Sequence, residues 1–375
     1  MKKIVFYSER WVDGGIEALI MNIISNSNLS EFEYKIIVGQ KETNSFDSKI
    51  NEYGIEFIEM HNKHFKNPIF RTLSSFFKFK KIISRESDAI IHINIYNSVG
   101  LVLGSLVKNK EKNRVIIHAH NNGIDKENDK LYIKRISNCI FRKIFTNTHY
   151  NYIACSDLAA KFCFDTKKIE KYYIMKNGIA SDKFCFNEET REKIRSELNI
   201  DNDTLVLGHV GRFVYQKNHV FLIDVFNKFI KTHNNSKLLL IGSGPLMKEL
   251  EKKVCEYNLK DKVIFLGNTE NVEKYMCAMD LFVFPSLYEG LGIVLIEAQC
   301  SGLRCFATDG LPDLVKVTNN IFFLELDINV WEKSLIEQMS YKRMNMSDEI
   351  RKAGFDIYDS VKNLEKEYEA IFNEK

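Results

Sequence analysis

Two glutamates, Glu289 and Glu297, stand eight positions apart on either side of a glycine-containing loop. The loop Gly290-Leu291-Gly292 precedes an apolar run and is expected at the start of a helix. Free backbone N–H groups and the positive end of the helix dipole favour an anion such as phosphate there. A carboxylate inside the helix can accept both hydroxyls of a ribose, and the other carboxylate can accept hydroxyls of a sugar. The pattern therefore favours a bound, charged sugar derivative.

Two other interpretations of Glu289 and Glu297 compete with this one. Most glutamates on helices are simply solvated, but a pair in this glycine and proline setting favours a site. A glycosidase would use two carboxylates as acid and nucleophile across one bond. Because both glutamates belong to one loop and helix, nothing places them on opposite sides of a substrate.

A cationic motif follows the apolar run 205–210, where Gly211 is followed by Arg212 and then by Lys217. Arg and Lys can neutralise a departing diphosphate where other enzymes use a metal ion. No His and Cys cluster has the spacing of metal ligands. We therefore predict no bound metal and no cofactor, although an Arg and a Lys five apart are more often plain surface residues.

Two histidines, His118 and His120, follow the apolar run 114–117. Alternate residues of a strand share a face, so both imidazoles are expected to point toward the same place. A packed or solvated role is the alternative, and it is favoured for His92 and His209.

Gly242-Ser243-Gly244 resembles the start of a dinucleotide fingerprint. The third glycine of G-x-G-x-x-G is absent, because Met247 occupies its position. A dehydrogenase is therefore disfavoured.

The elements that must position these residues follow a repeated pattern of short β-rich runs and longer amphipathic stretches. Such alternation predicts parallel sheets with helices on both faces. At 375 residues the chain is long enough for two domains. We predict an α/β fold of two tandem Rossmann-like, doubly wound domains facing each other across a cleft. The domains are expected at residues 1–185, with a C-terminal helix 355–375 crossing back to the first domain, and at 186–354.

Several motifs taken together resemble one known family. They are Gly211-Arg212 to Lys217-Asn218, Gly242-Ser243-Gly244-Pro245, Val263–Gly267 and Glu289–Glu297, with Gly14-Gly15-Ile16-Glu17 near the start and Asn177-Gly178-Ile179 before the second domain. This combination resembles glycosyltransferase family 4, whose members are retaining enzymes of the GT-B architecture that use nucleotide sugars. The resemblance covers most of the chain.

The resemblance implies a role for each matching residue of the second domain. The glutamate matching Glu297 holds the nucleotide ribose, and the one matching Glu289 contacts the donor sugar. The residues matching Arg212 and Lys217 clasp the diphosphate. The backbone near Asn268 is expected to face the base.

In the first domain, the resemblance assigns the glycine turn Gly14 and Gly15 to a close approach to the phosphates and the acceptor. It also assigns His120 to the transferred sugar, near the reacting centre. The implied function is transfer of a hexose from a nucleotide-diphosphate sugar to the hydroxyl of a glycan or lipid-linked acceptor, in capsular, exopolysaccharide or other cell-surface glycan biosynthesis. A non-catalytic sugar-nucleotide-binding subunit of a transferase pair and a nucleotide-sugar epimerase remain alternatives.

The charge is divided unevenly along the chain. Residues 1–180 contain 28 Lys and Arg against 19 Asp and Glu, whereas the rest contains 25 against 31. The segment 61–85 holds seven Lys and Arg, no acid and several phenylalanines. It is typical of a basic amphipathic helix on an anionic membrane surface. Nucleic acid and an ordinary packed helix are the alternatives, and we predict no nucleic acid partner.

The sequence also indicates a location. No signal-peptide core follows Met1, and no apolar stretch approaches the roughly 20 residues that span a bilayer. The eight cysteines are scattered without a C-x-x-C pair and are expected to be buried thiols in a reducing compartment. We therefore expect a cytoplasmic protein, peripheral on the inner face of the cell membrane.

Overall fold

The computed structural model describes residues 1–61, 68–107, 114–123 and 131–373, without the side chains of residues 68–72 and 131–133. The contacts divide the described chain into two units. Unit 1 takes its residues from Met1–Ile124, Asn128–Gly178 and Ile357–Lys375, and unit 2 is Ile179–Asp356. The unit boundaries thus fall at 178/179 and 356/357, whereas the sequence predicts them at 185/186 and 354/355.

Unit 1 is built on a seven-stranded sheet in the order β3-β2-β1-β4-β5-β6-β7. Every strand pairing in it is parallel. Its strands are β1 Lys2–Trp11, β2 Phe32–Lys41, β3 Glu56–Glu59, β4 Ala89–Ile95, β5 Arg114–Ala119, β6 Asn151–Ala154 and β7 Tyr173–Ile174. The central strands are apolar on both faces, as parallel strands covered by helices must be; all seven residues of β4 are buried.

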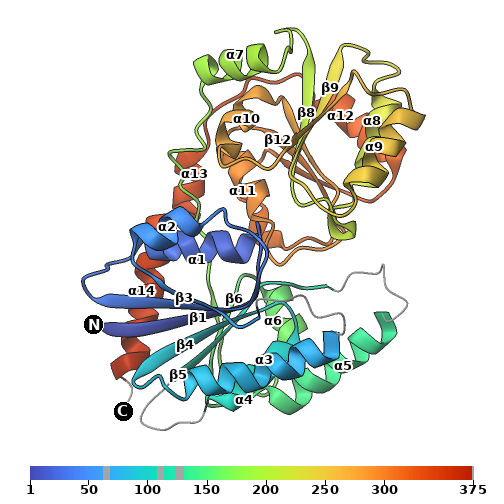
Figure 1. The fold of residues 1–375 in the computed structure, drawn as a ribbon. Coiled ribbons are helices and arrows are strands. Elements are labelled where there is room, and N and C mark those ends of the chain that lie inside the picture. Colours follow the sequence, from blue (N-terminus) through green and yellow to red (C-terminus); the bar gives the residue numbers. More distant parts are fainter. Residues whose placement is uncertain (62–67, 108–113, 124–130, 374–375) are drawn as a thin grey trace. The chain divides into compact units, whose positions relative to one another are not determined.

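Helices cover both faces of the unit 1 sheet (Figure 1). The helices α1, α2 and α14 lie on one face, and α3, α4 and α5 lie on the other. The helical elements are α1 Gly15–Asn26, α2 Asp47–Glu52, α3 Pro68–Ile83, η1 Ser98–Gly100, α4 Leu101–Leu106, α5 Leu131–Phe145, α6 Asp157–Cys163 and α14 Ile357–Asn373. The last helix joins unit 1 although it follows unit 2 in the sequence. Its Tyr368 is fully buried against the ring of Phe32.

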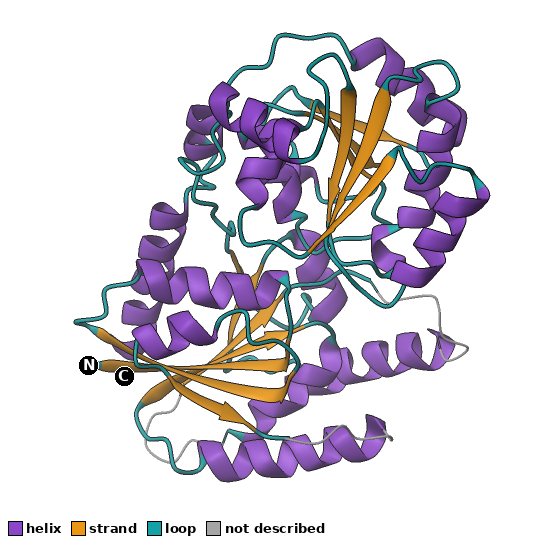
Figure 2. Cartoon of the chain, turned by 45° about the horizontal axis from the view of Figure 1, so that its top comes forward, coloured by secondary structure: helices purple, strands orange, loops and turns teal. Residues whose placement is uncertain are grey.

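Unit 2 repeats this plan with a six-stranded parallel sheet in the order β10-β9-β8-β11-β12-β13. Its strands are β8 Leu205–Val210, β9 Ser236–Ile241, β10 Val263–Gly267, β11 Leu281–Phe284, β12 Arg304–Thr308 and β13 Ile321–Leu324. Its helical elements are α7 Glu188–Glu197, η2 Tyr215–Lys217, α8 His219–Phe229, α9 Met247–Glu256, α10 Val272–Ala278, α11 Ile293–Cys300, η3 Asp313–Val315, α12 Ile328–Gln338 and α13 Ser347–Lys352. Figure 2 shows helices on both sides of each sheet.

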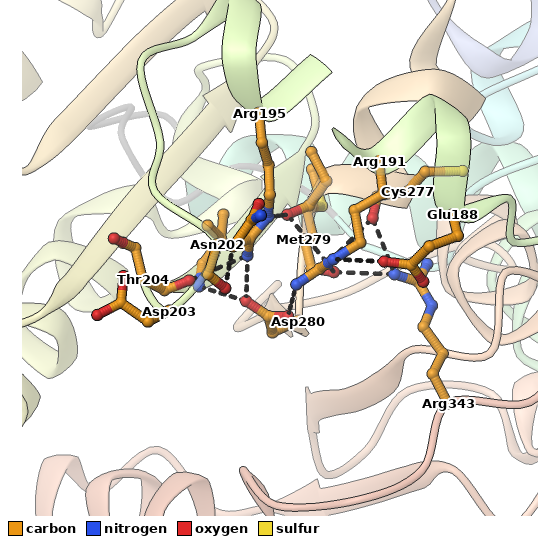
Figure 3. A network of polar contacts seen from close by, with 12 residues as sticks. Glu188, Arg191, Arg195, Asn202, Asp203, Thr204, Cys277, Met279, Asp280 and Arg343 are labelled. Carbon is orange, nitrogen blue, oxygen red and sulfur yellow. Dashed lines mark hydrogen bonds and ion pairs between the residues drawn. The ribbon is translucent and has the colours of Figure 1, made fainter. Parts of the chain in front are cut away.

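An arginine and aspartate network fixes the amino ends of β8 and β11 (Figure 3). Asp280 precedes β11; its carboxylate accepts from Arg191 at 2.6 Å, Arg195 at 2.7 Å and the backbone N–H of Val206 in β8 at 2.7 Å. The Arg195 side chain is 1% exposed and also donates to several backbone carbonyls. A buried ion pair of this kind avoids an unpaired charge because the hydrogen bonds are satisfied. It clamps the sheet at the edge opposite to the carboxyl ends of the strands.

The two doubly wound α/β domains predicted from the sequence are confirmed by these parallel sheets. The buried-thiol expectation is wrong for three of the eight free cysteines, since Cys255 is exposed and Cys139 and Cys185 are half-buried. Within the described residues, no helix combines the length and the apolar character needed to cross a bilayer.

Candidate functional site

The sheet of unit 2 has a switch point between β8 and β11. The chain runs from β8 outward through β9 to β10, and then returns to place β11 on the other side of β8. Loops leaving two adjacent strands in opposite directions open a crevice at their carboxyl ends, where ligands of doubly wound sheets bind. Arg212 and Lys217 follow β8, and Glu289 follows β11. The predicted residues of unit 2 therefore flank this switch point.

Lys217 and Glu289 are in direct contact. The Nζ of Lys217 lies 2.7 Å from the Oε1 of Glu289, and both side chains are largely buried. The same ammonium lies 4.7 Å from the ring centroid of Phe284, the last residue of β11. Gln216 ties the two loops together, because its side chain donates to Tyr288 O and its carbonyl accepts from Leu287 N, both at 2.8 Å. The cation and the carboxylate are thus held in place before any ligand arrives.

Glycines let the loop after β9 pack directly on the loop after β8. A Cβ on Gly242, whose φ is +131°, would lie 2.2 Å from Gly211 O, and one on Gly244 would lie 2.4 Å from Phe213 O. The N–H of Phe213 donates to Ser243 O at 2.8 Å. The Gly242-Ser243-Gly244 pattern therefore supports the backbone that carries Arg212.

Gly292 begins α11 with a φ of +90°, a conformation that glycine adopts without strain. No side chain caps the backbone N–H groups at this helix start. Gly290 and Leu291 are buried in the preceding loop. This is the arrangement that the sequence predicted for an anion at the start of the helix.

Glu297 lies one turn inside α11 and is half-buried. Burial, and then the charge of Glu273, raises the pKa of Glu297 to about 7. A carboxyl group with this pKa gains from ligand hydroxyls that donate to it, because such donors stabilise the charged form. Its position and its chemistry both suit a ribose.

The remaining predicted residues of unit 2 are exposed. Arg212 projects from the loop after β8, and Asn268 follows the edge strand β10, which β9 separates from β8.

Two buried hydroxyls without a hydrogen-bond partner were not predicted from the sequence: Ser286 after β11 and Thr308 at the end of β12. Buried polar atoms without partners are rare, and both of these lie at the carboxyl edge of the sheet. Only their place after apolar strands could have drawn attention to them.

The structure adds two observations on metal binding. Among the residues that the structure describes, no group of three or more His, Cys, Asp and Glu side chains is placed to hold a metal ion. The prediction of no metal assumed that the sequence contains no Asp-x-Asp pair, and this assumption is wrong because Asp201 and Asp203 form one. Both residues are exposed and precede β8, so they lie at the edge of the sheet away from Lys217 and Glu289.

Unit 1 has its own switch point between β1 and β4. Gly14 and Gly15 follow β1, and Gly15 begins α1. A Cβ on Gly14 would lie 2.7 Å from the Oε2 of the buried Glu17, whereas a Cβ on Gly15 would meet no atom within 4 Å. Protein packing therefore explains a glycine at position 14 and leaves open space beside Gly15.

Three imidazoles contact one another in turn: His92 in the middle of β4, His118 near the end of β5 and His120 directly after β5. The Nε2 of His92 is 3.1 Å from the Nδ1 of His118, and the rings of His118 and His120 have centroids 3.9 Å apart. The prediction that His118 and His120 point the same way is consistent with this contact. Burial lowers the pKa of His92 and of His120 to about 3, so both rings are neutral at pH 7. His92 also contacts the hydroxyl of Tyr368 on α14 at 2.8 Å.

Asn94 sets the protonation of His120. The Nδ2 of Asn94 donates to Tyr7 O at 3.1 Å, and a carbonyl can only accept. The Oδ1 of Asn94 therefore faces the Nε2 of His120, at 2.8 Å, and that nitrogen must carry the hydrogen. The lone pair of neutral His120 is then on Nδ1.

Comparisons with known proteins show what the chain is similar to. Residues 190–350 match the family model of the glycosyl transferases group 1. The solved structure of Anabaena Alr3699/HepE in complex with UDP and glucose superposes with a TM-score of 0.77 at 17% identity, covering 99% of this chain and 100% of that one. The family match supports a glycosyltransferase, and the structural match shows the two-domain GT-B fold.

Two relatives match this chain over nearly its whole length. EpsF of Bacillus subtilis (strain 168) is 26% identical, with 93% of this chain and 91% of that protein covered. The second relative is the N-acetylgalactosamine-N,N'-diacetylbacillosaminyl-diphospho-undecaprenol 4-alpha-N-acetylgalactosaminyltransferase of Campylobacter jejuni subsp. jejuni serotype O:2 (strain ATCC 700819 / NCTC 11168). It is 28% identical, with 94% of this chain and 93% of that protein covered.

Proposed function

We propose that this enzyme is a retaining glycosyltransferase of family 4 that moves a hexose from a nucleotide-diphosphate sugar to the hydroxyl of a glycan or lipid-linked acceptor. The observation that carries the proposal is the Lys217 and Glu289 pair beside the uncapped start of α11, at the switch point of unit 2. Such a place combines a fixed cation, backbone N–H groups and a carboxylate, which are the partners that a sugar diphosphate needs.

The donor would occupy these groups in order. Lys217 and the exposed Arg212 bind the diphosphate, the start of α11 adds backbone donors, and Glu297 accepts hydroxyls of the ribose. When the phosphate binds Lys217, Glu289 keeps its second oxygen for hydroxyls of the sugar. Cations fixed in advance stabilise the negative charge that develops on the leaving diphosphate.

The acceptor side of the proposal uses unit 1. His120 is neutral at pH 7, so its Nδ1 can accept a hydrogen bond from a hydroxyl of the transferred sugar. The reaction runs on one face of the sugar: the bond between the anomeric carbon and the phosphate oxygen breaks, and the acceptor oxygen bonds to that carbon. The departing phosphate oxygen takes the proton of the acceptor hydroxyl. We propose that the glycines Gly14 and Gly15 allow the close approach of the phosphates and the acceptor.

The biological setting follows from the resemblance and from the relatives. The name of the Campylobacter relative places its acceptor on diphospho-undecaprenol, which is a lipid carrier. We propose that this enzyme acts in the cytoplasm on a comparable acceptor, in capsular, exopolysaccharide or other cell-surface glycan biosynthesis.

The decisive experiment measures nucleotide release from UDP-, GDP- and ADP-sugars, after a thermal-shift screen has identified the donor that binds. Arg212→Gln and Lys217→Gln should each lower turnover at least tenfold, since a charged hydrogen bond contributes about 1.5 to 3 kcal/mol. Lys252→Gln, which changes an exposed lysine on α9, serves as the matched control. Unchanged turnover in both site variants would refute the assignment of the diphosphate to these residues.

Two further readouts of that experiment separate the proposal from its alternatives. A chelator should leave turnover unchanged, because the protein cations replace a metal ion. Release of nucleotide together with a new glycoside, whose anomeric configuration matches that of the donor, distinguishes a retaining transferase from an epimerase. An epimerase would instead return an isomer of the nucleotide sugar.

A further inference from the structure

Large apolar side chains are exposed on two helices of unit 1. On α3, Leu73 is 47% exposed and Phe77 is 76% exposed. On α5, Ile136, Ile140 and Ile144 are 41%, 47% and 64% exposed. Both sets recur at intervals of four, so each forms a stripe on its helix. These five residues are called the α3–α5 surface.

The two stripes lie on the same side of unit 1. Figure 1 shows α3 and α5 on the same face of the sheet, and both helices contact α4. The buried residues of these helices, such as Phe79 and Asn138, pack inward. The exposed residues therefore point away from the sheet, and the two stripes belong to one outer layer. The basic amphipathic segment predicted at 61–85 contains only the first of these stripes, since α5 lies outside it.

Among the described residues of α3 and α5, every charged side chain is basic. On α3, the exposed lysines Lys80 and Lys81 flank Phe77 in the helical projection. On α5, Lys143 is exposed beside Ile140 and Ile144, and Lys134 and Arg135 are exposed near the start of the helix. Neither helix contains Asp or Glu. An apolar stripe with a wholly basic border is the pattern of a helix in an anionic lipid interface.

We propose that the α3–α5 surface docks this protein on an anionic lipid bilayer. Phe77, Ile140 and Ile144 enter the boundary between head groups and acyl chains, while the lysine and arginine side chains reach the lipid phosphates. The part of the predicted segment 61–85 that falls at 62–67 lies outside the described residues, and the proposal does not use it.

Two other occupants fit this surface less well. Single-stranded nucleic acid needs aromatic faces on which bases stack. Of the five residues only Phe77 is aromatic, and the isoleucines of α5 offer no such face. A second copy of the chain would bring two surfaces with basic borders together, and like charges facing each other repel. The combination of aliphatic side chains and positive charge therefore favours lipid.

The test is co-sedimentation of the full chain with vesicles, without nucleotide sugar, so that its outcome is separate from the donor chemistry. Vesicles of phosphatidylcholine with about 30% phosphatidylglycerol are compared with pure phosphatidylcholine at low and at high salt. We expect binding only to the anionic vesicles and a loss of binding as salt screens the charges.

Two variants divide the contributions to binding. The apolar variant Phe77→Ser, Ile140→Ser, Ile144→Ser and the charge variant Lys80→Gln, Lys81→Gln, Lys143→Gln should each lower the partition coefficient at least tenfold. These side chains are exposed, so both variants should fold, which thermal unfolding checks. The matched controls lie in unit 2: Leu326→Ser with Met344→Ser, and Lys252→Gln with Lys333→Gln, all exposed.

Several results would overturn the proposal. The intact chain could fail to bind anionic vesicles, or the controls could lose as much binding as the two variants. Binding to an oligonucleotide without binding to vesicles would favour nucleic acid instead. A dimer in solution that the apolar variant dissociates, with no vesicle binding, would assign the surface to a second copy.

Discussion

At the scale of single residues, the surroundings of His120 determine what its ring can do. Because the Nδ2 of Asn94 donates to Tyr7 O, the Oδ1 of Asn94 faces His120 and accepts a hydrogen bond from its Nε2. The proton therefore stays on the Nε2 of His120. The ring of His118 contacts the ring of His120 at a tilt of 37°, with 3.9 Å between the ring centroids. The ring is thereby held in one tautomer and one place, as a residue that positions a sugar hydroxyl requires.

Replacing Asn94 by Leu should release this control. Without the amide oxygen, the proton of His120 is expected to redistribute between Nε2 and Nδ1. Nitrogen chemical shifts of ¹⁵N-histidine-labelled protein measure the tautomer directly and need no substrate. Turnover should fall while donor binding changes little, because the diphosphate contacts are in unit 2. A spectrum in which His120 keeps its Nε2 proton in the variant would contradict this prediction.

The second prediction at this scale concerns the carboxyl group of Glu297. Its pKa of about 7 means that it is partly protonated at neutral pH. Ribose hydroxyls donate to the charged form, so donor affinity should rise between pH 6 and pH 8. Glu297→Gln should bind more weakly and lose this pH dependence.

Calorimetric titration of the nucleotide-diphosphate sugar across this range checks the prediction. The raised pKa also has a consequence for folding. A carboxyl group with a raised pKa holds its proton longer in the folded chain, so this contribution to stability is complete below about pH 4.5 and is lost as the pH rises through 7. A flat affinity profile in the native protein would rule out the ribose contact.

At the scale of elements, the loops after β8 and β9 act as one support for Arg212. Their packing depends on the absence of a side chain at position 242, where a Cβ would lie 2.2 Å from Gly211 O. Neither loop can move away without breaking the hydrogen bond from Phe213 N to Ser243 O. The cationic loop is therefore fixed by its neighbour.

Gly242→Ala should lower the free energy of unfolding by more than about 2 kcal/mol and reduce turnover, because strain at a positive φ adds to a backbone clash. Gly310→Ala is the matched control: its φ is +80°, but a Cβ there meets no atom within 4 Å. It should cost only about 1 kcal/mol. Chemical denaturation of both variants separates the two effects, and equal losses would show that the clash contributes nothing.

The sequence predicted the elements whose patterns are local. The apolar run 205–210 is observed as the strand Leu205–Val210, and the helix predicted at 355–375 is observed at Ile357–Asn373. It did not predict β3, β7 and β13. These short strands lie at the edges of the sheets, where most of their residues are only partly buried and the apolar pattern is weak.

The site was predictable to the extent that its residues lie close to one another in the sequence. Glu289, Gly292 and Glu297 share one loop and helix, and their spacing alone indicated a ligand. The contact of Lys217 with Glu289 joins residues 72 positions apart, so only the order of the strands could bring it about. The same applies to Asn94 and His120, whose strands β4 and β5 are neighbours in the sheet.

At the scale of the whole molecule, five histidines of the described chain whose pKa is lowered make the fold sensitive to acid. Burial lowers the pKa of each of them: His92, His118, His120, His209 and His219. The unfolded chain binds protons below about pH 6.5, whereas the folded chain does not until the pH is far lower. Stability is therefore complete above pH 6.5 and is lost as the pH falls toward the folded pKa values.

In unfolding by denaturant, the free energy of unfolding should be lower at pH 5 than at pH 7 by at least about 2 kcal/mol. His219→Phe should reduce the slope, since this ring packs against Phe213 and His209 without a hydrogen-bond partner. The exposed His149 provides the comparison, because His149→Gln should leave the slope as it is. A stability that does not change over this interval would show that the folded chain binds these protons as readily as the unfolded chain does.

The return of α14 to unit 1 has a consequence for how the chain matures on the ribosome. Strands β1 to β7 emerge first, yet the helix that covers Phe32 and contacts His92 is translated only after all of unit 2. Domains usually fold in the order of synthesis. Here the later-made unit can be finished first, while the earlier one must wait with part of its core uncovered for its last segment to leave the exit tunnel.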